Sequence, residues 1–467
     1  MEHKQLGDDE AISNGRKLFS ESKAKCSIEE SIGQVLTTNY IIVERILNGL
    51  SISDLNTCAL VCKLWNIVSQ TIKKKRHDIF WMFQVAEYSD GDDDIFIDAH
   101  INSTDDKQNY VCSRNVGVGA HFYKILHEAP AEPKFGLLFC NDRFFFKPHQ
   151  YFLAFDVFNN LHHRKNKRIR TENVQMNHSG RMQYNTPVMN FLAKSFPRSC
   201  YLFACAVPGI VGTPVDWLAP IEAEEYPGFS GVFLPDIPGV NVYPFTVTEH
   251  NQFLASLNKR SKHKVQKMEI SQVTGIPNDA EVKCLLLFFM EVLEQDCPIQ
   301  TLVEHYLVKQ EKNIALGGAI VHELGFPFRV GNESRAIGGG VAFSGENVQA
   351  ASVIIEKHVK TIKELEIKLK KLKECNIPGK KCLGFMFACC GRGALFYQKS
   401  NVEATAFHKV FPNVPLFGVF GNGELGINYL PKQTKEKTKV NSTIKGISGR
   451  TWLHAYTTVF VLLSFEN

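Results

Sequence analysis

Two adjacent cysteines near the C-terminus are the residues best suited to covalent chemistry. Cys389 and Cys390 end an apolar run, and Arg392 follows them in a glycine-rich loop. A neighbouring cation and free loop N–H groups lower the pKa of a thiol and make it nucleophilic. His408 or His454 is a candidate base for a cysteine–histidine enzyme, although no spacing ties either one to a cysteine. The alternative, which we favour, is that both thiols pack as small apolar side chains.

A second glycine-rich loop, residues 421–426, carries polar side chains of its own. Asn422 and Glu424 lie in it, and with Arg392 they form a candidate clamp for a small ligand, because a guanidinium binds carboxylates bidentately. A structural salt bridge that joins the two loops is the alternative. The glycine spacing matches G-x-G-x-x-G, but Pro431 and a Lys/Thr-rich run follow instead of a helix. A dinucleotide site is therefore not expected.

Both loops require strands to position them. Residues 383–390 and 415–420 are apolar runs of strand length, and each leads into one of the loops. Neighbouring strands that both end in glycine-rich loops form a concave edge with free backbone N–H groups. Residues 403–410 have the pattern of a short helix between the two strands. The longest helical pattern covers residues 347–375, and we expect this helix to lie across a sheet.

A separate helical pattern occupies residues 36–72. Apolar residues recur there at i, i+3, i+4 and i+7, which predicts short amphipathic helices. Ser51 and Asp54 form a capping box at the start of one of them. Leu60 and Val61 lie off the apolar stripes, so these helices are apolar on more than one side. Because so small a unit cannot bury all of that surface, it packs either on the rest of the chain or on a partner.

The composition is that of an ordinary globular protein. The chain has 467 residues, enough for two or three domains, and its net charge of +5 is too small to predict direct nucleic-acid binding. We expect no signal peptide and no membrane-spanning segment, so the thirteen cysteines predict reduced thiols. No cofactor motif or metal-ligand pattern is found; His322 and Glu323 lack the second histidine of a zinc-protease motif. A basic run at residues 162–170 is either a nuclear import signal or a solvent loop, and we expect a cytoplasmic and nuclear protein.

Residues 54–65 resemble the second half of an F-box, the motif that docks onto the adaptor subunit of SCF-type ubiquitin ligases. The most specific part is Leu-Val-Cys-Lys-x-Trp at residues 60–65. The resemblance implies an all-α F-box module over residues 31–80, after a disordered tail over residues 1–30. It also implies that apolar and aromatic residues of the module contact the adaptor. These are Val43, Leu47, Leu50, Leu55, Leu60, Val61 and Trp65.

The C-terminal part resembles a FIST domain. The matching segments are residues 384–389, 391–393, 401–404, 411–418 and 420–424, with earlier matches at 207–211 and 342–345. The resemblance implies a FIST region whose N-terminal part covers residues 85–330 and whose C-terminal part covers residues 331–467. The implied fold class is α+β, a small helical module followed by a large mixed α/β region with helix-covered sheets.

Together the two resemblances imply the substrate-recognition subunit of a cullin–RING ligase, with no catalysis and no cofactor of its own. The F-box would bind the adaptor and, through it, the cullin–RING assembly, while the FIST region would capture proteins for ubiquitination and proteasomal degradation. The alternative is a FIST domain that senses an amino acid or similar metabolite. Its candidate ligand-binding residues are Cys389, Arg392, Asn422 and Glu424.

Overall fold

The computed structural model describes most of the chain. The described residues are 32–87, 95–97, 125–142, 145, 196–215, 219–224, 226–248, 269–290, 298–309, 314–325, 336–431 and 451–466. The chain divides into two compact units. The helical unit contains Met1–His77 and His127–Glu132, and the sheet unit contains the remainder. The predicted tail at residues 1–30 and the basic run at residues 162–170 lie outside the described residues.

The helical unit is built from α2 (Tyr40–Leu47), α3 (Ile52–Cys58) and α4 (Lys63–Lys75). Asn39 caps α2 and Ser51 caps α3, each by accepting a hydrogen bond from a backbone N–H of the first turn. The apolar stripes of the helices meet in one small core. Its buried members are Val43, Leu47, Ile52, Leu55, Val68 and Ile72.

Residues 127–132 complete the helical unit, beyond the predicted range of residues 31–80. The Ile52 N–H donates to the Ala129 carbonyl at 3.4 Å. Arg76 follows α4, and its guanidinium donates to the Asn48 and Leu50 carbonyls, each at 2.6 Å. The Arg76 bonds satisfy carbonyl groups of the turn that follows α2.

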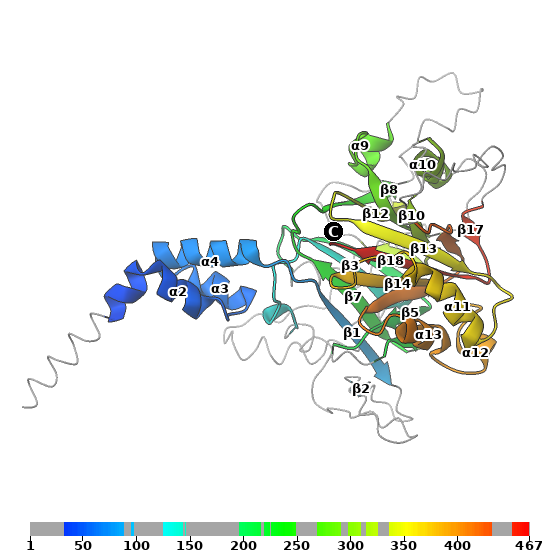
Figure 1. Ribbon diagram of the computed structural model, residues 1–467, viewed down its shortest axis with the longest axis horizontal. Helices are drawn as coiled ribbons and strands as arrows, with labels where there is room; N and C mark the ends of the chain where they lie inside the picture. Colours follow the sequence, from blue (N-terminus) through cyan, green and yellow to red (C-terminus); the bar gives the residue numbers. More distant parts are fainter. Residues whose placement is uncertain are drawn as a thin grey trace, which may run out of the picture. The chain divides into compact units, whose positions relative to one another are not determined.

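The sheet unit contains three six-stranded sheets (Figure 1). The first has the order β11 (Glu323–Gly325), β4 (Tyr201–Val207), β3 (Phe135–Asn141), β7 (Gly228–Leu234), β1 (Phe80–Glu87) and β2 (Ile95–Ile97). The second has the order β17 (Leu453–His454), β16 (Glu424–Gly426), β10 (Ala315–Ile320), β9 (Val282–Phe289), β12 (Ala336–Ser344) and β8 (Asn241–Thr248). The third has the order β13 (Gln349–Ile355), β18 (Thr458–Ser464), β14 (Cys382–Cys389), β15 (Leu416–Gly421), β5 (Gly209–Gly212) and β6 (Ile221–Ala223).

The three sheets repeat one arrangement and exchange strands in a cycle. Each contains a parallel pair, β3/β4, β9/β10 or β14/β15, and an antiparallel strand beside the first member of the pair. After each pair the chain turns and adds a short strand to a neighbouring sheet. Thus β5 pairs with β15, β11 with β4 and β16 with β10. The sheet unit is therefore three similar strand–turn–strand units arranged around a common centre.

Equivalent aromatic side chains fill that centre. Phe139, Phe288 and Phe387 each lie on the first strand of a parallel pair, and all are fully buried. The ring centroids of Phe139 and Phe288 are 5.7 Å apart, and those of Phe288 and Phe387 are 5.8 Å apart. Aromatic pairs at such distances add to the stabilisation gained from burying their area. The core shared by the three sheets therefore holds this unit together.

Helices cover the outer faces of the sheets. The described helices of the sheet unit are α9 (Ile270–Thr274), α10 (Pro298–Glu304) with a π-helical turn (His305–Lys309), α11 (Ile362–Lys373), α12 (Ala394–Tyr397) and α13 (Val402–Val410). Leu365 of α11 and Phe407 of α13 are buried in a cluster with Met386 and Phe460 of the third sheet. The expected α+β fold is thus confirmed, with a helical module followed by helix-covered sheets.

The predicted helix over residues 347–375 is wrong in its first half. Residues Gln349–Ile355 form β13, paired antiparallel with β18. The apolar residues of this stretch fit a helical period, but β-branched residues at 353–355 favour a strand, and pairing with β18 decides the matter. The helix begins only at Ile362, where Thr361 and Glu364 form a capping box.

The expected boundary between two FIST parts, at residues 330 and 331, lies inside the sheet unit. The second sheet contains β9 and β10 from before this position and β12 from after it, with β9 hydrogen-bonded to both. The two parts therefore share one sheet and do not form separate compact units.

Candidate functional site

The two glycine-rich loops leave the same edge of the third sheet. β14 and β15 pair in parallel, from Gly384 opposite Leu416 to Cys389 opposite Gly421. Backbone hydrogen bonds link the second loop to the end of β10, and His322, which follows β10, to β4: the His322 N–H donates to the Ala206 carbonyl at 2.9 Å. The Asn422 N–H donates to the Ile320 carbonyl at 2.9 Å. The carboxyl ends of strands from all three sheets therefore meet at one end of the sheet unit.

Four polar side chains form a hydrogen-bonded row at this end, which we call the axial site: Asp142, His322, Asn422 and Cys390. Asp142 Oδ2 lies 2.5 Å from His322 Nδ1, and His322 Nε2 lies 2.8 Å from Asn422 Nδ2. The Cys390 thiol donates to Asn422 Oδ1 over 3.6 Å. A neutral imidazole with its proton on Nδ1 donates to the Asp142 carboxylate, and its Nε2 accepts from the Asn422 amide. This single assignment of protons is compatible with all three hydrogen bonds of the row.

Each member of the axial site follows a strand of a parallel pair. Asp142 follows β3, His322 comes after β10, Cys390 follows β14 and Asn422 follows β15. From the sequence, Asn422 was expected beside Cys389, whereas the structure places Cys390 on it; Asp142 was not selected, and His322 was considered only as a zinc ligand. The available signal was their position after apolar strands, because the carboxyl ends of parallel strands share one edge.

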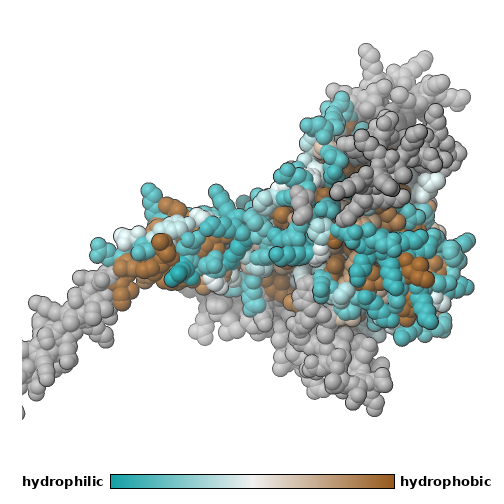
Figure 2. All heavy atoms as spheres, viewed as in Figure 1, coloured by the Kyte–Doolittle hydropathy of each residue, from teal (hydrophilic) through white to brown (hydrophobic). Residues whose placement is uncertain are grey.

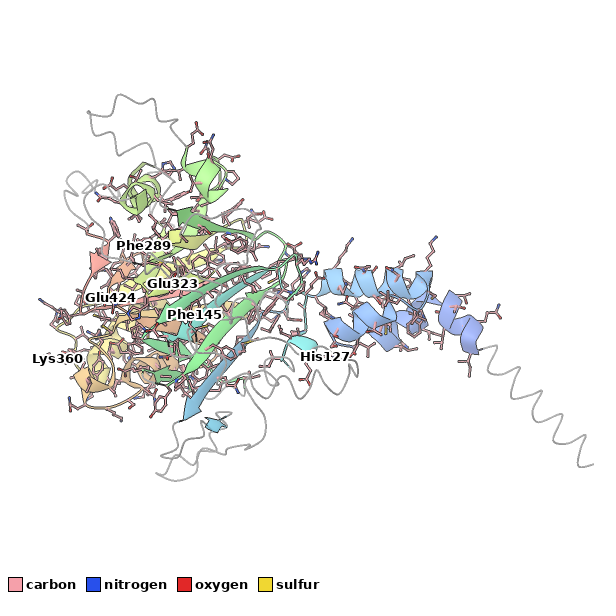
Figure 3. The ribbon with its side chains drawn as sticks, turned by 180° about the vertical axis from the view of Figure 1, so that it is seen from behind. His127, Phe145, Phe289, Glu323, Lys360 and Glu424 are labelled. Atoms are coloured by element: carbon pink, nitrogen blue, oxygen red, sulfur yellow. The ribbon has the colours of Figure 1, made fainter. Side chains whose placement is uncertain are left out.

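Glu424 is the first residue of β16, just after Asn422 and Gly423, and it is fully buried. Figure 3 labels it within the sheet unit. Thr457 Oγ1 donates to Glu424 Oε2 at 3.1 Å, whereas Oε1 has no hydrogen-bond partner among the described residues. Burial raises the pKa of Glu424 to about 7. Burial and the Glu424 carboxylate raise the pKa of the Cys389 thiol to about 11. Both raised pKa values favour the protonated forms, the Cys389 thiol and the Glu424 carboxylic acid, over their ionised forms.

Glu424 is expected to make the protein less stable as the pH rises. Its pKa is about 7 in the folded protein and 4.5 as the reference value, so the folded state binds the proton more tightly. The resulting stabilisation, about 3 kcal/mol, is complete below pH 4.5 and is lost as the pH rises through 7. Glu424→Gln keeps the size of the side chain and cannot titrate. Urea unfolding from pH 5 to 8 should show a smaller decline in the variant; parallel curves for both proteins would contradict this assignment.

The two cysteines are expected to differ in reactivity. Cys390 is exposed, whereas Cys389 is 7% exposed and its pKa is raised to about 11. The thiolate is the reactive form, so a mild alkylator at neutral pH should label Cys390 first. Peptide mass spectrometry measures this directly, with Cys390→Ser as the control that removes the early label. Earlier labelling of Cys389 would contradict the expectation.

Arg392 does not face a ligand in this structure. Its side chain is fully buried, and its guanidinium pairs with Glu403 at 2.6 Å. It also donates to the Val359 carbonyl at 3.3 Å and to the Tyr397 hydroxyl, and it lies over the Phe396 ring at 4.8 Å. Arg392 is thus part of a buried salt bridge, but Glu403 lies in α13, so the bridge does not join the two glycine-rich loops as the alternative to a ligand clamp had it. Because Arg392 is buried in this salt bridge, its guanidinium does not bind a ligand carboxylate as the clamp hypothesis requires.

Neither histidine considered as a catalytic base is hydrogen-bonded to a cysteine among the described contacts. His454 Nε2 lies 2.9 Å from the Gly426 carbonyl, and His408 belongs to α13. His322 is linked to Cys390 instead, through Asn422, which is hydrogen-bonded to both.

The residues expected to bind the adaptor divide into three groups: buried, exposed and partly buried. Val43, Leu47 and Leu55 are buried in the core of the helical unit. Leu60 is 86% exposed and Val61 is 60% exposed, in the connection between α3 and α4. Leu50 and Trp65 are partly buried against the same core. The Trp65 indole also donates to the Leu36 carbonyl at 2.6 Å, so it holds the preceding segment in place.

No described helix is both long and apolar enough to cross a membrane. In the part of the chain that the structure describes, no group of three or more His, Cys, Asp or Glu side chains is arranged to hold a metal ion.

Comparison with known proteins finds relatives that cover different shares of this chain. Residues 301–427 match the FIST C domain. F-box only protein 22 of Pongo abelii is 27% identical over 438 residues, which cover 92% of this chain and 93% of that protein. F-box only protein 22 of Homo sapiens is 32% identical over 280 residues, 58% of this chain and 65% of that protein. An F-box/LRR-repeat protein of Arabidopsis thaliana is 30% identical over 84 residues, 18% of this chain and 15% of that protein.

Proposed function

We propose that this chain, which is similar to F-box only protein 22 along nearly its whole length, is the substrate-recognition subunit of an SCF-type ubiquitin ligase. In this proposal the helical unit is the F-box and binds the adaptor subunit. The sheet unit, which contains the FIST C match, captures proteins for ubiquitination and proteasomal degradation.

The observation that carries the proposal is the apolar surface of the helical unit. Leu60 and Val61 are exposed, and so are isoleucines of α2 and α4, although the unit has a complete core of its own. The exposed isoleucines are Ile41, Ile42, Ile46 and Ile67. Figure 2 shows brown apolar side chains gathered on this unit. Exposed apolar groups of this kind mark protein-binding surfaces.

A receptor of this kind acts without chemistry of its own. It raises the effective concentration of a bound protein beside a ubiquitin-charged enzyme and holds it in position for transfer. No step in this role requires Cys389, Cys390 or His322 to form a covalent intermediate. We propose that it works in the cytoplasm and the nucleus, which fractionation of cells expressing the tagged chain will test.

Co-expression with the adaptor subunit is the direct test of the proposal. The two proteins should elute together in size-exclusion chromatography as a stoichiometric complex, because the exposed residues of the helical unit offer the apolar core that a stable interface needs. Separate elution of the adaptor and the folded chain would overturn the proposal.

A further inference from the structure

The third sheet ends in a strand that has little backbone pairing. β6 pairs with β5 over three residues, from Ile221 opposite Gly212 to Ala223 opposite Ile210, and the described sheet stops there. So short an edge strand is held by few ladder hydrogen bonds and opens at a low cost in free energy. Side-chain contacts must therefore supply much of its attachment.

Two side-chain contacts tie β6 to the start of α13. The Glu222 N–H donates to Asn401 Oδ1 at 2.7 Å, and the Ala404 N–H donates to Glu222 Oε1 at 2.6 Å. Ala404 lies in the first turn of α13, where the helix has no carbonyl to offer its N–H. Glu222 therefore acts as a cap for α13, although it belongs to a strand of the sheet.

The Glu222 carboxyl group is buried beside a second carboxylate. Glu222 is 7% exposed, Glu403 in the first turn of α13 is fully buried, and the residue opposite Glu222 on β5 is the uncharged Val211. Oε2 of each glutamate has no hydrogen-bond partner among the described residues. Burial, and after it repulsion from Glu403, raises the pKa of Glu222 to about 8.

The cation of this cluster is already engaged. Arg392 pairs with Glu403 at 2.6 Å and also donates to the Tyr397 hydroxyl, which in turn donates to Glu403 Oε1 at 2.6 Å. Glu222 forms no ion pair with a described lysine, arginine or histidine, and Glu224 adds a further negative charge that acts on it. The ionised form of Glu222 therefore has like charges around it and no cation of its own.

Ionisation of Glu222 consequently opposes the attachment of β6. With β6 in place the carboxyl group holds its proton up to a pH of about 8, whereas in water its pKa returns to the reference value of 4.5. Because the folded-state pKa is the higher one, the contribution of Glu222 to the attachment is fully present below pH 4.5. It is lost as the pH rises through about 8.

We propose that β6 is a pH-responsive edge strand, which stays on β5 while Glu222 holds its proton and shifts toward a released state when that proton is lost. Release lets the carboxylate reach water and move away from Glu403, and it removes the cap from α13. β5 then becomes the edge of the third sheet, with a row of backbone groups open to another strand. No residue of the helical unit takes part, so this device is independent of adaptor binding.

Hydrogen–deuterium exchange of the full chain, measured by mass spectrometry at pH 6, 7 and 8, tests the proposal. Division by the exchange rates of the corresponding free peptides removes the intrinsic effect of pH, so the remaining protection reports opening of the structure. Protection of the peptides that contain Glu222 and Ala404 should fall about 50-fold from pH 6 to pH 8, as pKa values of 4.5 and about 8 imply. Unchanged protection over this range would overturn the proposal.

Peptides from β14 provide the internal reference for this measurement. β14 lies inside the third sheet, so its exchange reports global unfolding, and it should be slower than that of β6 at every pH. Equal protection of the two strands would show that β6 opens only when the whole unit unfolds, and would also overturn the proposal. This comparison needs no variant.

Glu222→Gln is the matched variant, because its amide oxygen still accepts from the Ala404 N–H and its side chain cannot lose a proton. Protection of its β6 peptides should agree within about two-fold between pH 6 and pH 8. Glu424→Gln removes another buried carboxyl group whose pKa is raised, and it should leave the response of β6 as in the wild type. A wild-type response in Glu222→Gln, or loss of the response in Glu424→Gln, would contradict the assignment to Glu222.

Discussion

Arg392→Met is expected to lower the free energy of unfolding by about 3–5 kcal/mol, the cost of removing one partner from a buried ion pair. Glu403 would keep its charge in a site where its side chain is fully buried. The carbonyl of Val359 and the hydroxyl of Tyr397 would lose their donor as well. Urea unfolding followed by far-UV circular dichroism at pH 7 measures the change.

The double variant Arg392→Met/Glu403→Gln is the control for this prediction. It removes both charges, so it should recover a large part of the lost stability, because the main cost of the single variant is an unpaired buried carboxylate. A single variant within about 1 kcal/mol of wild type would show that the Arg392–Glu403 pair does not stabilise the attachment of the first glycine-rich loop to α13.

Leu60→Asp with Val61→Asp is expected to abolish co-purification with the adaptor subunit. Both side chains are exposed, so the folded chain should keep its stability within about 0.5 kcal/mol. Central apolar anchors of an interface contribute about 2–4 kcal/mol each. The dissociation constant should therefore rise by at least about 1,000-fold, as measured by surface plasmon resonance with immobilised adaptor.

Two controls separate binding from folding in this experiment. Ile367→Asp makes the same chemical change at a 61%-exposed position of α11 in the sheet unit, and it should leave adaptor binding unchanged. Val43→Ala acts on a fully buried residue, so it should lower the stability of the helical unit through loss of packing. Unchanged adaptor affinity in the aspartate double variant would remove the exposed surface from the proposed interface.

The strands and loops of the candidate site follow from local sequence. The apolar runs at residues 383–390 and 415–420 are β14 and β15, and the predicted short helix between them is α13. Each apolar run is bounded by glycine or proline signals, so its type and length depend on nearby residues only. The failure at residues 347–375 has the opposite cause: β13 exists because β18, far along the chain, pairs with it.

Side-chain partners could not be predicted in the same way. Asp142 and His322 are separated by 180 positions, and His322 and Asn422 by 100, yet they share one hydrogen-bonded row. The Arg392 guanidinium could pair with a ligand carboxylate or with Glu403, and the chemistry of arginine does not distinguish the two. Its burial beside Glu403 in the folded protein decides for the internal pair. Val43 and Leu60 are similar in type, but one lies in the core and the other in solvent.

The sequence by itself therefore determined the helical module, the strands that end in glycine-rich loops, and the resemblance to F-box and FIST proteins, because caps, turns and apolar periodicity act over a few residues. The tertiary structure alone decided which side chains meet. Strand exchange among three sheets brings distant turns to one end, and burial fixes whether a charged group is paired inside the protein or left open to a partner.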